Sequence, residues 1–225
     1  MLLRDMIESV NYALNLLMEG LELRGLTNCV NIIIGADHGM SQTTKGRRSF
    51  ADEHGGDGYC YSEGQDEKGV YCYTGVVARI GPALFTSGEK FDVEQEWDSF
   101  KCSRTDPENP ARWKAYRKDT DLPKRLHYHS SVRVEPIVMP MDDEWYSSKS
   151  QSSSYTLLGN HGYDNLYESM RALFVGFGPS FKQGFETEYI HQNIELYNMM
   201  CHLVGVEPSG NNGTVGSMNH VLQNV

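Results

Sequence analysis

The sequence contains no long hydrophobic run, and the apolar stretch at 30–34 is already interrupted by Asn31. A helix that crosses a bilayer needs about 20 consecutive apolar residues, so no segment of this chain is expected to span a membrane. The first ten residues, MLLRDMIESV, include Asp5 and Glu8 and lack the uniform apolar core of a signal peptide.

Basic residues are also scarce, with 20 Lys and Arg against 30 Asp and Glu, for a formal charge of −10. This balance argues against a general nucleic-acid binder, which meets phosphates with basic charge. An anionic substrate is still compatible with it, because a bound metal ion can invert the local field.

Five cysteines are too few for a disulfide scaffold, and their odd number leaves at least one thiol unpaired within the chain. Cys60 and Cys72 flank a predicted hairpin, where a disulfide is plausible. The sequence also lacks a G-x-S-x-G elbow, a P-loop and a G-x-G-x-x-G fingerprint, which removes the common signatures of serine hydrolases and nucleotide-binding folds.

Apolar periodicity predicts an α/β domain. Apolar residues recur at spacings of three and four from Leu3 to Leu21, which indicates an amphipathic helix. The run VNIIIGA at 30–36 reads as a strand covered on both faces, which is typical of a parallel sheet with helices on both sides. Further elements are predicted as strands at 76–80, 126–128, 132–139 and 170–177 and a helix at 193–204. Polar connections between them, including the Ser-rich 147–154, would carry the site.

Asp37 and His38 directly follow the first predicted strand, where α/β sheets bind their ligands. Neighbouring residues point to opposite sides of an extended chain, so both can face one metal only if the chain turns, and Gly39 permits a turn. A carboxylate and an imidazole suit zinc. The alternative is that Asp37 begins a turn and His38 is an ordinary loop histidine.

A second polar group, NHGYDN at 160–165, precedes the strand predicted at 170–177. His161 is a candidate metal ligand, and Asp164 is a candidate acceptor that orients its ring. The alternative is a polar turn built around Gly162 and Asn165. The remaining histidines carry weaker signals: His127 and His129 alternate along a predicted strand, whereas His54, His191, His202 and His220 have no partner at ligand spacing.

Taken together, several segments resemble the nucleotide pyrophosphatase/phosphodiesterase (ectonucleotidase) family. They are, in chain order, CVNIIIGADHGM, LPKRLHY, RVEPIVM, HGYDN, SMRALFVGFGPSFK, NIELYNMMCHLVGVEPSGNNGT and GSMNHVL. The resemblance is best at 26–41 and 160–222 and looser at 42–125.

This resemblance implies an alkaline-phosphatase-like α/β fold with a mostly parallel sheet and helices on both faces. It also implies two zinc ions and a Thr or Ser nucleophile that attacks a phosphodiester or a nucleotide pyrophosphate. Asp37 and His38 match ligands of the zinc that activates the nucleophile, and His161 matches a ligand of the other zinc. The sequon at Asn212 fits a glycosylated protein that is extracellular or at the cell surface.

The family's catalytic domain begins earlier, with a metal-binding Asp, the nucleophile and an Asp-x-x-Gly-His motif that do not occur in this sequence. We therefore expect residues 1–225 to be the C-terminal portion of a phosphodiesterase catalytic domain, lacking the nucleophile and holding zinc poorly by itself. Two alternatives are a catalytically inactive truncated product with at most an interaction role, and a monoesterase or sulfatase of the same superfold.

Overall fold

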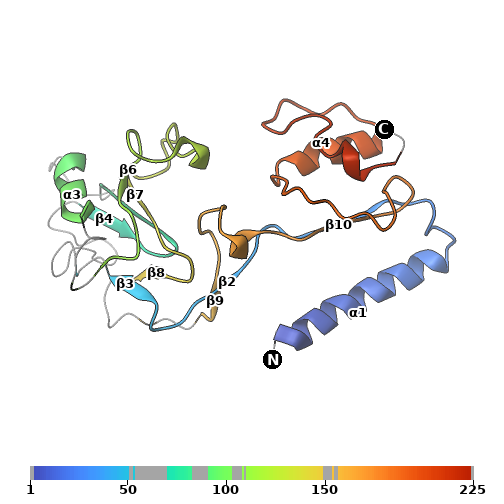
Figure 1. Cartoon of the computed structure of the whole chain (residues 1–225), viewed down its shortest axis with the longest axis horizontal. Helices are drawn as coiled ribbons and strands as arrows, with labels where there is room; N and C mark the ends of the chain where they lie inside the picture. The colour runs from blue at the N-terminus through green and yellow to red at the C-terminus, as the bar shows by residue number, and fades with distance from the viewer. Residues whose placement is uncertain are drawn as a thin grey trace. The chain divides into compact units, whose positions relative to one another are not determined.

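The computed structural model describes residues 3–50, 53, 70–82, 91–102, 108, 110–148, 154 and 157–223. The chain divides into two compact units (Figure 1): the first comprises 1–37 and 172–225, and the second comprises 38–171. The first unit contains α1 (Leu3–Glu22), β1 (Ile32–Gly35), β10 (Phe174–Phe177), α4 (Glu195–Val204) and the 3-10 helix η4 (Asn219–Val221). No helix among the described residues is both long and apolar enough to cross a membrane.

The second unit is built mainly of short strands. Its elements are β2 (Ser41–Gln42), β3 (Arg48–Phe50), β4 (Val70–Tyr73), β5 (Val77–Pro82), α3 (Val93–Phe100), β6 (Tyr116–Arg117), η2 (Lys124–Leu126), β7 (Ile137–Pro140), β8 (Tyr146–Ser148), β9 (Gly159–Asn160) and η3 (Glu168–Met170).

Helix α1 confirms the amphipathic pattern read from the sequence, but none of its residues is buried. Most of its large apolar side chains are exposed, from 48% for Leu17 to 78% for Leu3, whereas Leu14, Met18 and Leu21 are half-buried. Burial among the described residues therefore contributes little to the stability of α1.

Strands β1 and β10 pair antiparallel, with Ile32 opposite Phe177 and Gly35 opposite Phe174. Among the described strands only β3 and β8 pair parallel, so the mixed α/β class is confirmed while the expected mostly parallel pairing is corrected. The apolar runs led to the incorrect prediction of parallel pairing for a physical reason. They report burial on both faces of a strand, whereas strand direction depends on the connections between strands.

The core of the first unit lies where α4 and the C-terminal segment pack together. Its buried side chains are Phe181, Met199, Met218, Val221 and Leu222, with Ile33 of β1 and Phe174 of β10 packed against them. The helix ends, as the sequence predicted, before Gly205, which adopts a left-handed conformation with φ 70° and donates its N–H to the last carbonyls.

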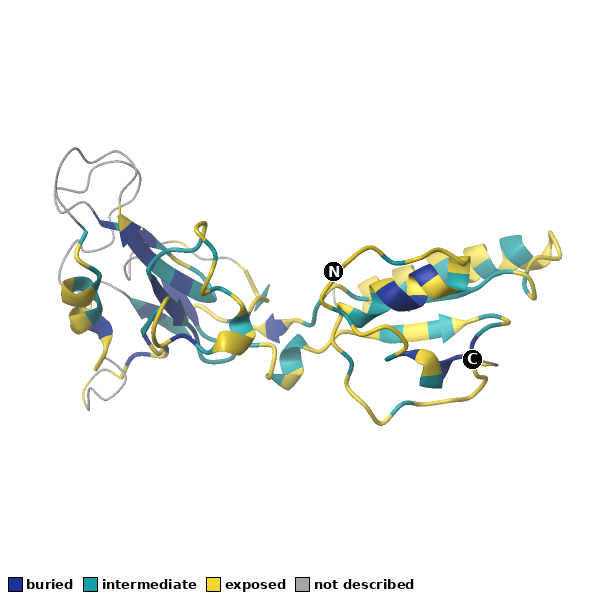
Figure 2. Cartoon of the chain, turned by 90° about the horizontal axis from the view of Figure 1, so that it is seen from above, coloured by how far each residue is buried: buried dark blue, intermediate teal, exposed yellow. Residues whose placement is uncertain are grey.

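The core of the second unit is the four-stranded antiparallel sheet in the order β4-β5-β7-β6. Ile80 and Ile137 are fully buried, and Trp113 and Phe100 are 1% exposed. Figure 2 shows these strands largely in the colour of buried residues. This sheet forms the buried centre of the second unit.

The strand predicted at 126–128 is wrong. The chain forms η2 at 124–126 and then turns at His127, whose φ of 57° is left-handed. His127 and His129 are therefore exposed turn residues and not neighbours on a strand face.

Cys72 is disulfide-bonded, whereas Cys60, His54 and most of the Ser-rich segment lie outside the described residues.

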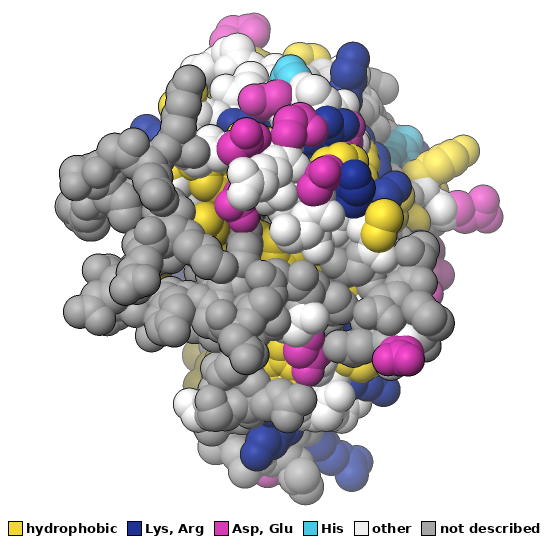
Figure 3. Space-filling model, turned by 90° about the vertical axis from the view of Figure 1, so that its left-hand side faces the viewer, with side chains coloured by type: hydrophobic (Ala, Val, Ile, Leu, Met, Phe, Trp, Pro, Cys, Tyr) yellow, Lys and Arg dark blue, Asp and Glu magenta, His cyan; other side chains and the backbone are white. Residues whose placement is uncertain are grey.

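Charges of both signs mix on the surface of the second unit, as the face in Figure 3 shows. Arg117 illustrates the pattern: its guanidinium is 2.6 Å from the Asp121 carboxylate and 2.7 Å from that of Glu94. The bond from Arg117 lowers the pKa of Asp121, so the network is ionised at neutral pH. Mixed charge of this kind is ordinary solvated surface.

Candidate metal centre

Pairing of β2 with β9 brings together two histidines that are far apart in the sequence. The two strands run antiparallel, with Ser41 opposite Asn160. His38 precedes β2 and His161 directly follows β9, so both lie at the same end of the strand pair. Two of the predicted ligands thus meet within the second unit.

The rings of His38 and His161 stack with their centroids 3.7 Å apart and an interplanar angle of 14°. His38 is half-buried, whereas His161 is exposed. Imidazole nitrogens are the commonest protein ligands of zinc, so the donor chemistry of this pair fits the predicted metal.

The position of His38 depends on a close backbone approach at Gly39. Gly39 donates its N–H to the Met170 carbonyl at 3.0 Å. A Cβ at Gly39 would lie only 2.0 Å from the Ser169 carbonyl oxygen and 2.8 Å from that of Arg171. Gly39 is not among the described residues with positive φ. The sequence predicted that Gly39 permits a turn, whereas the structure requires a glycine there because two chain segments touch.

A hydrogen bond sets the tautomer of His38. Its Nδ1 lies 2.7 Å from the Gly39 carbonyl oxygen. A carbonyl oxygen can only accept, so Nδ1 carries the proton and the neutral ring has its lone pair on Nε2. Metal-binding histidines are usually held this way, with the other ring nitrogen donating to a carbonyl or carboxylate.

Asp37 is exposed and belongs to the first unit, where its backbone carbonyl accepts a bond of 3.4 Å from the Asn193 side chain. Within the described residues the structure shows no cluster of three or more His, Cys, Asp or Glu side chains that could hold a metal. The donor types therefore fit zinc, but the described donors do not complete a catalytic zinc site, which normally takes three protein ligands.

Asp164 makes its main contacts with Arg125, a residue that the sequence analysis did not single out. Arg125 donates to both carboxylate oxygens, with a distance of 2.8 Å to Oδ1, and the Leu166 amide donates to Oδ1 at 3.0 Å. The bond from Arg125 holds the pKa of Asp164 below its usual range. The predicted role of Asp164 in orienting His161 stays a prediction. No local spacing links residues 125 and 164, so only the tertiary fold reveals this pair.

The Arg125–Asp164 pair also forms part of the wall of a cavity of about 330 Å³ in the second unit. Tyr116 and Tyr167 line the same cavity, together with the ammonium-bearing Lys114. The carboxylates of Asp142 and Asp164 balance the two cations in this lining, so the aromatic rings and not a net charge distinguish the cavity.

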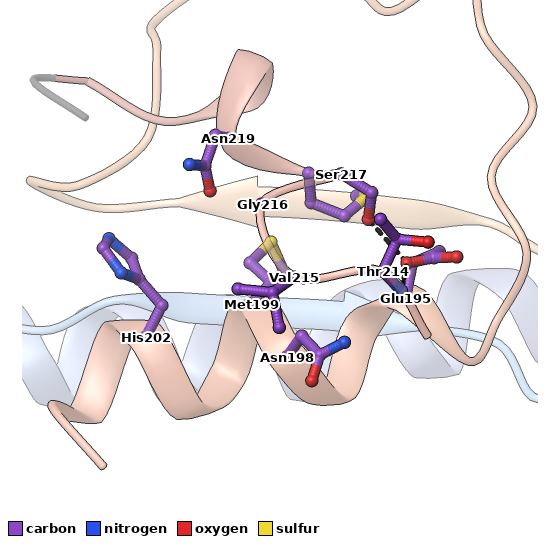
Figure 4. Close-up of a pocket in the computed structure, with 10 residues that line it drawn as sticks. Glu195, Asn198, Met199, His202, Thr214, Val215, Gly216, Ser217 and Asn219 are labelled. Atoms are coloured by element: carbon purple, nitrogen blue, oxygen red, sulfur yellow. Dashed lines mark hydrogen bonds between the residues drawn. The ribbon is translucent and has the colours of Figure 1, made fainter. Parts of the chain in front are cut away.

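A second concave site in the first unit lies between α4 and the loop that follows it (Figure 4). Its carboxylate, Glu195, accepts bonds from the Ser217 hydroxyl at 2.6 Å and from the Thr214 amide at 2.7 Å. These bonds, with Ser217 first, lower the pKa of Glu195. Both bonds tie the loop to α4, so the carboxylate anchors the loop. Asn212, the predicted glycosylation site, is exposed on this loop.

Comparison with known proteins identifies the family of this chain. The family model described as type I phosphodiesterase/nucleotide pyrophosphatase matches residues 2–164. The chain therefore belongs to this family of phosphodiesterase and nucleotide pyrophosphatase hydrolases. The match includes the stretch at 42–125, where the sequence motifs are loosest.

Individual relatives agree with this assignment. Ectonucleotide pyrophosphatase/phosphodiesterase family member 3 of Bos taurus is 38% identical over 221 residues, covering 96% of this chain and 23% of that protein. A venom phosphodiesterase of Macrovipera lebetinus is 36% identical over 223 residues, covering 97% of this chain and 24% of that protein. The chain thus spans about a quarter of the length of the curated relatives it matches.

The solved structure of human ectonucleotide pyrophosphatase/phosphodiesterase 5 matches with a TM-score of 0.77 at 28% sequence identity. The match covers 98% of this chain and 52% of that chain. It confirms the alkaline-phosphatase-like α/β fold, present here in part, that the sequence resemblance implied.

Proposed function

We propose that this chain contributes His38 and His161 to the two-zinc centre of a phosphodiesterase that hydrolyses nucleotide phosphodiesters or pyrophosphates. The observation that carries the proposal is the ring pair, which β2 and β9 assemble from distant parts of the sequence. Asp37 would join the set as the carboxylate ligand that the family resemblance assigns to the zinc of His38. Residues 1–225 would then be the C-terminal portion of the catalytic domain.

The chemistry of such a centre is consistent with these donors. Zinc held by these donors would supply positive charge that neutralises the charge developing on phosphorus and on the attacking and leaving oxygens. His38 is held with its lone pair on Nε2, which is the form in which imidazole binds metal. A metal centre also reconciles an anionic substrate with an acidic chain of charge −10.

The family supports a proposal for the compartment and the substrate class. Its relatives include an ectonucleotide pyrophosphatase/phosphodiesterase and a venom phosphodiesterase. We infer an extracellular or cell-surface protein that acts on small nucleotides or related phosphodiesters, with a glycan on Asn212.

The test is hydrolysis of 4-nitrophenyl thymidine 5′-phosphate by the product of the complete reading frame that contains this chain. His38→Ala and His161→Ala should each lower kcat/KM by at least about 100-fold, because even outer-shell partners of a metal are worth about 10- to 100-fold. His129→Ala is the matched control, because His129 is exposed on a turn of the same unit. 4-Nitrophenyl phosphate and 4-nitrocatechol sulfate serve as competing substrates.

A protein that prefers the monoester or the sulfate ester would overturn the phosphodiesterase assignment. Unchanged diester hydrolysis in His161→Ala would overturn the metal assignment. The 225-residue chain by itself is expected to be inactive, because it contains no residue that matches the family nucleophile. Diester hydrolysis by that chain, lost in His161→Ala, would refute this expectation.

A further inference from the structure

Two other histidines, which have no partner at ligand spacing in the sequence, meet in the first unit. His191 lies just before α4 and His220 lies within η4. Their rings stack with centroids 4.8 Å apart and an interplanar angle of 29°. Both side chains are half-buried, so water and small ions reach them.

The Nε2 atoms of both rings converge on one point, which the hydroxyl of Thr187 marks. Thr187 Oγ1 lies 3.5 Å from His191 Nε2 and 3.3 Å from His220 Nε2. Zinc binds imidazole nitrogen at about 2.0–2.1 Å, so one ion can reach both ring nitrogens when the Thr187 hydroxyl moves out of the space between them.

Hydrogen bonds assign the protons of this cluster. His220 Nδ1 lies 3.1 Å from the Ser217 carbonyl, which can only accept, so the lone pair of His220 is on Nε2. The Tyr189 amide already donates to Thr187 Oγ1 at 3.1 Å. The single hydroxyl proton of Thr187 can therefore go to His220. In that arrangement His191 donates its Nε2 proton to the Thr187 hydroxyl. If water transfers this proton to Nδ1, the Nε2 lone pair of His191 faces the Thr187 oxygen instead.

Aromatic neighbours hold the ring of His220 in place. Phe185 and Tyr189 meet it edge-on, with centroids 6.3 Å and 6.1 Å away. Glu195 anchors the loop that supplies the Ser217 carbonyl. A ligand whose tautomer and orientation are both set in advance loses little entropy on binding metal.

We propose that His191 and His220 form a second metal site, in which their Nε2 atoms bind one divalent transition-metal ion such as Zn²⁺ and water completes the coordination. This site lies wholly in the first unit, whereas His38 and His161 belong to the second. It therefore does not depend on the proposed catalytic centre.

The charged groups around the pair have opposing effects. Burial and the neighbouring His220 lower the pKa of His191. The negative charge of Glu195 acts in the other direction on this pKa and attracts a cation. The Lys182 ammonium, which donates to the His220 carbonyl at 2.8 Å, opposes a cation at the site. Because these charges act in opposite directions, we expect the two histidines to bind a divalent metal ion with moderate affinity.

The test is isothermal titration of the 225-residue chain with Zn²⁺ at pH 7.5. His191→Ala and His220→Ala should each weaken binding at this site by at least tenfold. His161→Ala should leave it unchanged, which separates this proposal from the proposed catalytic centre. Thr187→Val is the discriminating variant, because it removes the hydroxyl while keeping both imidazoles.

If the pair binds metal, Thr187→Val should retain Zn²⁺ affinity within about threefold or bind more tightly. Zn²⁺ binding that is equal in wild type, His191→Ala and His220→Ala would overturn the proposal. Loss of binding in Thr187→Val with both histidines intact would also overturn it, because the ion would then depend on the Thr187 hydroxyl and not on the two Nε2 atoms and water. Circular dichroism of each variant confirms that the fold is retained.

Discussion

Replacement of Gly39 by alanine tests the close approach that positions His38. The added Cβ would meet the Ser169 oxygen at 2.0 Å, the Arg171 oxygen at 2.8 Å and the Met170 carbonyl carbon at 2.8 Å. All three are backbone atoms, so no side chain can rotate away to make room. The segments must separate, which also breaks the bond from the Gly39 amide to Met170.

The magnitude follows from these two losses. Overpacking costs about 1–3 kcal/mol, and a backbone hydrogen bond contributes about 1 kcal/mol. Gly39→Ala should therefore lower the free energy of unfolding of the second unit by about 2–4 kcal/mol. With a urea m-value of about 2 kcal/mol/M, the midpoint should fall by about 1–2 M.

Tryptophan fluorescence during urea unfolding measures this change, because all three tryptophans, Trp97, Trp113 and Trp145, lie in the second unit. Gly46→Ala is the matched control. A Cβ there would have only the Thr44 hydroxyl within reach, at 3.9 Å, and its φ is outside the left-handed region. This control should be neutral or stabilising by about 0.4–1 kcal/mol, since alanine reduces the entropy of the unfolded chain.

Equal urea midpoints for Gly39→Ala and Gly46→Ala would refute the reasoning. They would mean that the 38–40 and 169–171 segments do not touch as the structure places them, and that the approach does not hold His38 in position.

Two further predictions concern Asp164 and Asn212. Asp164→Asn should lower the free energy of unfolding by at most about 1 kcal/mol at pH 7, because the ion pair with Arg125 is partly exposed and solvent screens it. The pKa of Asp164 is lowered in the folded state, so this stability is present above the unfolded Asp pKa of about 3.9 and is lost as pH falls through the lower folded value. The urea midpoints of wild type and Asp164→Asn should thus converge in acid. A difference between the two midpoints that is constant with pH would contradict the ion pair. Asp119→Asn, which changes a largely exposed carboxylate, is the control. In a secretory host Asn212 should carry a glycan, since it is exposed on a loop. Glycosidase treatment should increase the gel mobility of wild type and not that of Asn212→Gln. Unchanged mobility of both proteins would exclude the modification.

Local sequence patterns predicted those elements that depend on nearby residues. The spacing of apolar residues located α1 and α4 to within two residues at each end, and the strands β1, β5 and β10 fall inside or next to the runs predicted for them. The prediction at 126–128 failed because Pro123 and the left-handed His127 favour a tight turn that strand propensity does not detect. The long sequence motifs were sufficient to predict the family, because each motif matches at many positions at once.

Only the tertiary structure decided which distant residues meet. The β2–β9 register stacks His38 on His161, and the loop that Glu195 anchors places His220 against His191. The same is true of Arg125 and Asp164, and of the antiparallel direction of β1 and β10. Amino-acid periodicity reports which face of an element is buried. Partners far apart in the chain are chosen by strand register and loop closure, which depend on the whole fold.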